Sequence, residues 1–104
     1  MALRIVYVTH ESEEQALALG RQLVEERLAA CVNVLPGMRS CYRWEGAIEE
    51  GREAVLLVKT REDLADAVVR RVAELHGYSV PCALVLPIEG GHAPYLEWLA
   101  RETG

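Results

Sequence analysis

The sequence contains no phenylalanine and a single lysine, Lys59, among its 104 residues. Arginine supplies the remaining positive charge, and 16 acidic residues outnumber the 11 basic ones, giving a formal net charge of −5. Only Arg70 and Arg71 are adjacent cations, so the basic patch typical of nucleic-acid-binding proteins is missing. We therefore expect no nucleic-acid partner. Asparagine and glutamine, which are thermolabile, are also scarce; this scarcity favours a thermostable protein, although a GC-rich genome gives a similar bias.

Long apolar runs are absent as well. No stretch approaches the roughly 20 apolar residues that a membrane-spanning helix requires. The first ten residues enter a strand-like pattern directly, without the apolar segment and small-residue cleavage site of a signal peptide. With 51% hydrophobic residues and 26% charged residues, the chain has enough apolar material for one core. We expect a single domain over residues 1–104, cytoplasmic and without a membrane partner.

Three cysteines are too few and too scattered for the common cysteine-based sites. Cys31, Cys41 and Cys82 form no C-x-x-C pair, which excludes a zinc ribbon and a thioredoxin-type motif. A buried, reduced thiol is the expected state of each.

Hydrophobic periodicity and turn residues divide the chain into strands and helices. Residues 31–60 are predicted to form a β-hairpin with unusually long arms. A bend or bulge at Pro36-Gly37 interrupts its first arm, and Pro36 makes this arm an edge strand. Capping patterns place one helix start at Ser12, with Gln15 three residues on, and another at Thr60. The predicted elements are a strand at 3–9, a helix at about 12–29, hairpin arms at 31–44 and 47–60 around a turn at 45–46, a helix at 60–78, a strand at 82–90, and a helix at 93–104.

This order predicts an α+β fold of the ferredoxin-like βαββαβ type with an extra C-terminal helix. The expected sheet order is 4-1-3-2, with the two crossover helices on one face. Nothing in the chain is left to cover the other face. Residues 55–58 and 83–88 are apolar on both sides of their strands, which predicts burial by another subunit.

The same topology brings two of the three histidines to one end of the subunit. His10 and His76 should lie near the hairpin tip, whereas His92 lies at the opposite end and can meet them only across subunits. Imidazole and carboxylate groups together can bind a divalent transition metal, and the acidic tip residues are Glu45, Glu49 and Glu50. The alternative is that these are ordinary loop and surface residues.

Four aromatic residues are candidates for a recognition surface or for packing: Tyr42, Trp44, Tyr95 and Trp98. Lys59, near the end of the second hairpin arm, is a candidate pairing charge. The sequence contains no P-loop, HExxH, GxGxxG or nucleophile-elbow motif. On its residues alone, the chain is expected not to be an enzyme.

Taken in order, four segments resemble the divalent-cation tolerance protein family, CutA. They are "LAACVNVLPGMRSCYRWEGAIEE", "E-x-x-LLVKT", "H-x-Y-x-x-P" (His76, Tyr78, Pro81) and "YLEWL". The resemblance runs from about residue 4 to residue 99. It implies a tight homotrimer of ferredoxin-like subunits in which the long kinked hairpin and the free sheet edges pair between subunits.

The resemblance also implies a function, the binding of copper or other divalent cations in the response to metal ions, with the metal not required for folding. Some family members use a strand-1 cysteine and two histidines at the end of helix 2, but Val8 and Leu75 occupy two of these positions here. His76 remains, and a site would recruit His10 or a carboxylate. Because the trimer resembles PII signalling proteins, the alternative is a regulatory or scaffold module. Its inter-subunit cleft would be lined by Tyr42, Trp44, Lys59, Tyr95 and Trp98.

Overall fold

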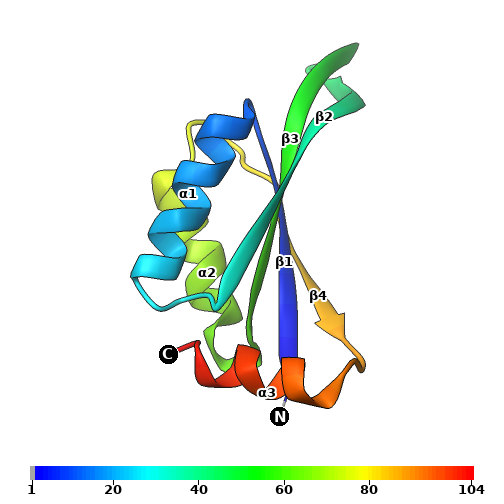
Figure 1. The fold of residues 1–104 in the computed structure, drawn as a ribbon. Helices are drawn as coiled ribbons and strands as arrows, with labels where there is room; N and C mark the ends of the chain where they lie inside the picture. The colour runs from blue at the N-terminus through cyan, green and yellow to red at the C-terminus, as the bar shows by residue number, and fades with distance from the viewer. Residues whose placement is uncertain (1) are drawn as a thin grey trace.

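The computed structural model describes residues 2–104 and contains four strands and three helices (Figure 1). In chain order they are β1 (Leu3–His10), α1 (Glu13–Glu25), β2 (Cys31–Trp44), β3 (Ala47–Arg61), α2 (Glu62–Leu75), β4 (Ala83–Ile88) and α3 (Ala93–Arg101).

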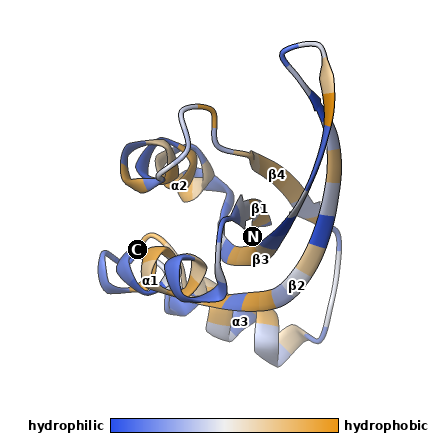
Figure 2. Ribbon diagram, turned by 90° about the horizontal axis from the view of Figure 1, so that it is seen from above, coloured by the Kyte–Doolittle hydropathy of each residue, from blue (hydrophilic) through white to orange (hydrophobic). Residues whose placement is uncertain are grey.

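The strands form one antiparallel sheet in the order β2-β3-β1-β4, which confirms the ferredoxin-like order predicted from the sequence. Helices α1 and α2 lie together on one face of the sheet, and α3 lies at its base (Figures 1 and 2). Alternation along the strands turns one set of side chains toward the helices. The core therefore forms between the helices and the sheet, from residues that include Val6, Val8, Leu23, Leu56, Val58, Val68 and Val72.

The β2–β3 hairpin extends well beyond the two helices (Figure 1). The kink predicted at Pro36-Gly37 is confirmed as a register shift between Leu35 and Met38, where Gly37 has a φ of 74°. The predicted turn is also confirmed, because Glu45 and Gly46 both have positive φ values, 49° and 84°, as a type I′ turn requires.

Helix α1 begins as predicted but ends earlier than residue 29. Ser12 caps it by accepting a hydrogen bond from the Gln15 amide at 3.2 Å. The helix ends at Glu25 because Arg27 adopts a left-handed conformation with a φ of 63°. The amide of Leu28 then donates to the carbonyl of Leu23, and that of Arg27 to Val24, which is the Schellman pattern. The predicted ranges 60–78, 82–90 and 93–104 likewise shorten to α2, β4 and α3.

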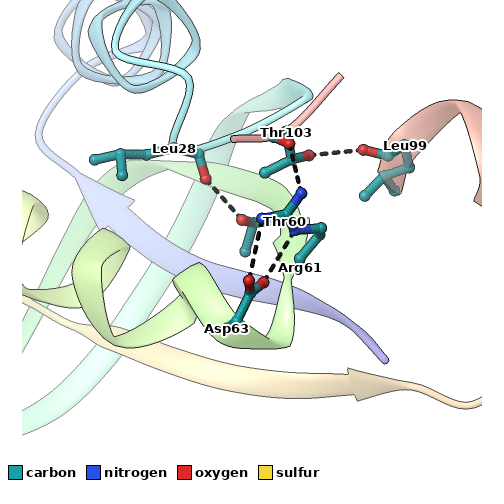
Figure 3. Close-up of polar contacts among 6 residues, drawn as sticks. All are labelled: Leu28, Thr60, Arg61, Asp63, Leu99 and Thr103. Atoms are coloured by element: carbon teal, nitrogen blue, oxygen red, sulfur yellow. Dashed lines mark hydrogen bonds and ion pairs between the residues drawn. The ribbon is translucent and has the colours of Figure 1, made fainter. Parts of the chain in front are cut away.

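Thr60 does not cap α2, contrary to the prediction; the cap position is Arg61. Thr60 belongs to β3 and is fully buried, and its hydroxyl donates to the Leu28 carbonyl at 2.6 Å (Figure 3). Arg61 contacts Asp63 and donates to the Thr103 carbonyl at 2.9 Å, while the Thr103 hydroxyl donates to the Leu99 carbonyl. This cluster joins the last residues of the chain to the base of the sheet.

Among the described residues, none forms a helical layer over most of the face of the sheet opposite α1 and α2. On β4, which is largely hydrophobic (Figure 2), Leu84 and Leu86 point to this face and remain 56% and 44% exposed. The prediction of buried thiols fails within the subunit, since Cys41 is exposed on the hairpin and Cys31 and Cys82 are only partly buried. Within residues 2–104, every helix is too short or too polar to cross a membrane.

Candidate functional site

The contact between His10 and His76 is the clearest side-chain arrangement that the sequence predicted. His10 is the last residue of β1, and His76 follows the last residue of α2. Their rings stack with centroids 3.9 Å apart and planes inclined by 15°, and both residues are buried. His92 lies at the opposite end of the subunit, exposed at the start of α3.

The hydrogen bonds of the two rings define their protonation. His76 Nε2 lies 2.7 Å from the Thr9 carbonyl, so this nitrogen carries the proton, and Nδ1 accepts from the Tyr78 amide at 3.1 Å. His10 Nδ1 accepts from the Glu11 amide at 2.8 Å. Burial and the proximity of His76 lower the pKa of His10. The two imidazoles are therefore stacked face to face, and Nδ1 of each ring accepts a backbone amide hydrogen.

This geometry limits how the pair can bind a metal ion. Each nitrogen lone pair lies in its own ring plane, and two nearly parallel, stacked planes do not meet at one ion. Within the described residues no three histidine, cysteine or acidic side chains are grouped as a metal site. The acidic groups whose charges reach His10 are Glu11 and Glu53. Glu45, Glu49 and Glu50 lie toward the hairpin tip, as predicted, but the tip is far along the hairpin from the histidine pair, because His10 pairs with Ala54.

A groove of about 900 Å³ lies on the uncovered face, where the hairpin leaves the rest of the sheet. Tyr42 and Trp44, two of the predicted cleft residues, line it together with Tyr7, Tyr78 and Glu53. The Glu53 carboxylate accepts hydrogen bonds from the Ser40 hydroxyl at 2.7 Å and the Tyr78 hydroxyl at 3.0 Å. Burial and this bond to Glu53 raise the pKa of Tyr78 to about 12, so its phenol remains protonated.

Glu53 and Tyr78 are groove residues that were not predicted. Strand alternation places Glu53 on the uncovered face with Tyr7, because their neighbours Ala54 and Val6 face the helices. The position of Glu53 could therefore have been predicted from strand alternation. The position of Tyr78 could not, because it depends on the path of the loop from His76 to Cys82.

The other predicted cleft residues form a second cluster at the base of the sheet. Lys59 Nζ donates to the Tyr95 hydroxyl at 3.1 Å and lies 5.3 Å from the centre of its ring. Trp98 stands beside Tyr95, with ring centroids 5.6 Å apart, and Cys31 Sγ lies 3.6 Å from the Tyr95 hydroxyl. Within one subunit, therefore, the five predicted cleft residues divide between the two ends of the sheet.

These features define a class of protein: a ferredoxin-like α+β subunit with an overlong hairpin, an uncovered sheet face and a histidine pair at one end. Comparison with known proteins identifies the family. The family model described as "CutA1 divalent ion tolerance protein" matches residues 4–102. The chain belongs to this family.

Individual relatives are similar in sequence over nearly the whole of this chain. The divalent-cation tolerance protein CutA of Thermus thermophilus is 48% identical over 100 residues, covering 96% of this chain and 97% of the relative. The chloroplastic CutA 1 of Oryza sativa is 46% identical over 99 residues, 95% of this chain, which spans only 56% of that relative's length. The name of the Thermus thermophilus relative and the description of the family model refer to tolerance of divalent cations and not to a catalysed reaction.

Solved structures show the same fold. The divalent cation tolerance protein of Thermus thermophilus superposes with a TM-score of 0.93 at 47% identity, over 98% of this chain and 99% of that one. CutA1 of Oryza sativa gives a TM-score of 0.96 at 43% identity, over 100% and 95% of the two chains.

Proposed function

We propose that this protein is a homotrimer that binds divalent cations of the copper type as part of the response to metal ions. Family membership supports the cation, and the contact between His10 and His76 carries the proposal for where it binds. Imidazole nitrogen is a good ligand for Cu²⁺ and neighbouring transition ions. Nδ1 of each ring accepts a backbone amide hydrogen and so carries a lone pair, which is what a metal ion requires of an imidazole nitrogen.

Binding at this pair requires a rearrangement. Both nitrogens of His76 are engaged, with Thr9 and Tyr78, and His10 Nδ1 is engaged with Glu11. An ion must replace at least one of these hydrogen bonds and turn one ring out of the stack. We therefore expect weak, exchangeable binding that folding does not require.

Calorimetric titration of the trimer with Cu²⁺ tests this proposal. We expect a site with a dissociation constant below about 1 mM, lost in His76→Ala and weakened in His10→Ala. His92→Ala, which removes an exposed imidazole at the opposite end, is the matched control and should bind like the original protein. A titration with no measurable site, or equal losses in all three variants, would refute it.

The uncovered sheet face supports the trimer. A monomer that exposes Leu84 and Leu86 on the uncovered face of β4 presents an apolar surface that a second copy can bury. Light scattering after size-exclusion chromatography should give three chain masses. A single chain mass would contradict the proposed assembly.

A second candidate function is a regulatory or scaffold module that receives a small molecule or protein between subunits. The groove lined by Tyr42 and Trp44 favours it, because its volume of about 900 Å³ is in the range of small-molecule sites. A thermal-shift screen with nucleotides and small metabolites tests this candidate, since a ligand that binds only the folded state raises the unfolding temperature.

A further inference from the structure

Three side chains with reactive groups, Cys31, Lys59 and Tyr95, converge at the base of the sheet. Cys31 begins β2, and its direct cross-strand partner is Lys59, near the end of β3. The Cβ atoms of such partners lie about 5 Å apart on the same face of a sheet. Both side chains reach the hydroxyl of Tyr95 on α3, Cys31 with Sγ at 3.6 Å and Lys59 with Nζ at 3.1 Å. A thiol and a primary amine are therefore held against the same oxygen atom.

The contacts that hold this pair lie within one chain. The Ala30 amide donates to the Lys59 carbonyl at 3.0 Å, which fixes the start of β2 beside β3. The ring of Tyr95 packs beside Trp98, and its centre lies 5.3 Å from the Lys59 amine. The approach of the thiol to the amine therefore follows from the fold of the subunit. It depends neither on how much of this face is exposed nor on a bound ligand.

Cys31 is the thiol that the structure places beside a lysine. Lys59 is the only lysine in the sequence, and in the described part of the chain no carboxylate lies within 4.0 Å of its amine. Cys41 instead faces Glu50 across the hairpin. Burial raises the pKa of the Cys82 thiol. Because the thiolate is the reactive form of cysteine, this shift disfavours reaction at Cys82.

A neighbouring thiol and amine can be joined once the sulfur is oxidised. Attack of the Cys31 sulfur on hydrogen peroxide breaks the O–O bond and forms an S–O bond, giving a sulfenic acid and water. The Lys59 amine, after releasing a proton to solvent, then attacks the sulfur. An N–S bond forms, the S–O bond breaks, and the hydroxyl leaves as water with a second proton from the amine. Sulfenic acids condense with backbone nitrogen in the same way.

We propose that Cys31 and Lys59 form a peroxide-sensitive cross-link, a sulfenamide bond between the thiol on β2 and the amine on β3. Formation of the bond withdraws the amine from the hydroxyl and ring of Tyr95, so α3 loses this contact with β3. The cross-link also removes the positive charge of Lys59. The inference needs neither a metal ion nor a ligand and goes beyond both functions proposed above.

Mass spectrometry of the assembled protein after treatment with hydrogen peroxide tests the inference. The double variant Cys41→Ser/Cys82→Ser keeps Cys31 as its only thiol, so a disulfide within the chain cannot form. We expect its mass to fall by two hydrogen atoms and its digest to contain the Cys31 and Lys59 peptides joined. Dithiothreitol, oxidised to its own disulfide, should cleave the N–S bond and restore the original mass. The same joined peptides should appear in the original protein, which keeps the test independent of how well the double variant folds.

Lys59→Arg is the matched control for the amine. It keeps a positive charge and a hydrogen-bond donor near Tyr95 but replaces the amine by a guanidinium group, which does not attack the sulfur. We expect this variant to gain the mass of an oxygen atom at Cys31, as a sulfenic acid that dimedone traps, and to form no cross-link.

Three results would overturn the inference. The first is an assembled protein in which peroxide leaves Cys31 unmodified, as burial between copies would cause. The second is a loss of two hydrogen atoms that persists in Lys59→Arg, which would assign the bond to a different nitrogen. The third is a cross-link that joins two chains, which would place the amine of one copy beside the thiol of another.

Discussion

The hydroxyl of Thr60 shows how one buried side chain connects distant parts of this subunit. It lies at the end of β3, is fully buried, and donates to the carbonyl of Leu28 in the segment that follows α1. Because Leu28 lies beyond the end of α1, its carbonyl accepts no hydrogen bond from that helix. The side chain of Thr60 therefore supplies a hydrogen-bond donor to a partly buried backbone carbonyl.

Substitution of Thr60 by valine should cost about 1–3 kcal/mol in the free energy of unfolding. Valine has nearly the same shape but leaves the Leu28 carbonyl without its donor. Thr60→Ser retains the hydroxyl and is the control, expected to lose less stability. Urea denaturation measures both, and equal losses would mean that packing of the methyl group, and not the hydrogen bond, matters.

At the scale of elements, Glu26 and Arg71 connect the two helices. The Arg71 guanidinium donates from Nε and Nη2 to the two oxygens of Glu26, both at 2.9 Å. These bonds, with one from Gln22, lower the pKa of Glu26 from 4.5 to about 2. Glu26 is the cap residue of α1, so the pair fixes the end of that helix against α2.

The sign of the resulting pH dependence follows from this shift. The unfolded chain takes up the proton near pH 4.5 and the folded chain only near pH 2, so the contribution of the pair is lost as the pH falls between these values. In Glu26→Gln the melting temperature should decrease less between pH 5 and pH 3 than it does in the original protein. Glu25→Gln, in an exposed pair with Arg21 on the same helix, is the control; an equal effect there would exclude a special role for Glu26.

Gly20 determines how closely α1 approaches the sheet. A Cβ atom at this position would lie 2.7 Å from Val32 Cγ2 and 2.9 Å from Leu56 Cδ1. Gly20→Ala gains helix propensity of up to about 1 kcal/mol, but the stiff, β-branched Val32 cannot easily move away. We expect a net loss of about 1 kcal/mol or more in the free energy of unfolding. Gly51→Ala is the control and should not show this loss, because a Cβ atom there would have nothing within 4 Å in the described part of the chain apart from its own chain neighbours.

Periodicity predicted most of the elements, because apolar residues such as Ala16, Leu19 and Leu23 on α1 and Val68 and Val72 on α2 recur at helical spacing, and these residues are buried. Helix ends were less predictable. Arg27 takes the left-handed conformation usually reserved for glycine, so no residue type marked the end of α1.

The candidate site was predictable to the extent that topology decides it. Strand direction alone brought His10 and His76 to one end, but the engagement of their nitrogens with Thr9, Glu11 and Tyr78 depends on tertiary detail. The exposed thiol of Cys41 has a similar cause, since the hairpin extends past the helices that would have covered it.

At the scale of the whole molecule, the two faces of the sheet differ in what covers them. One face of the sheet is covered by α1 and α2, whereas the other carries exposed apolar side chains on β4 and the hairpin. Leu84 belongs to this uncovered face, because its cross-strand partner Tyr7 points away from the core. Leu17, on α1, is almost equally exposed, at 54% against 56% for Leu84, but lies on the outer side of a helix.

These two leucines test whether the uncovered face builds the proposed trimer. Leu84→Glu places a charge on that face and should lower the mass measured by light scattering, because burial of an unpaired carboxylate between subunits is costly. Leu17→Glu makes the same chemical change at equal exposure in the subunit and should leave the mass at three chains. If β4 remains free in solution, both variants will behave alike. Dissociation by Leu17→Glu alone would instead place the interface on the helical side of the sheet.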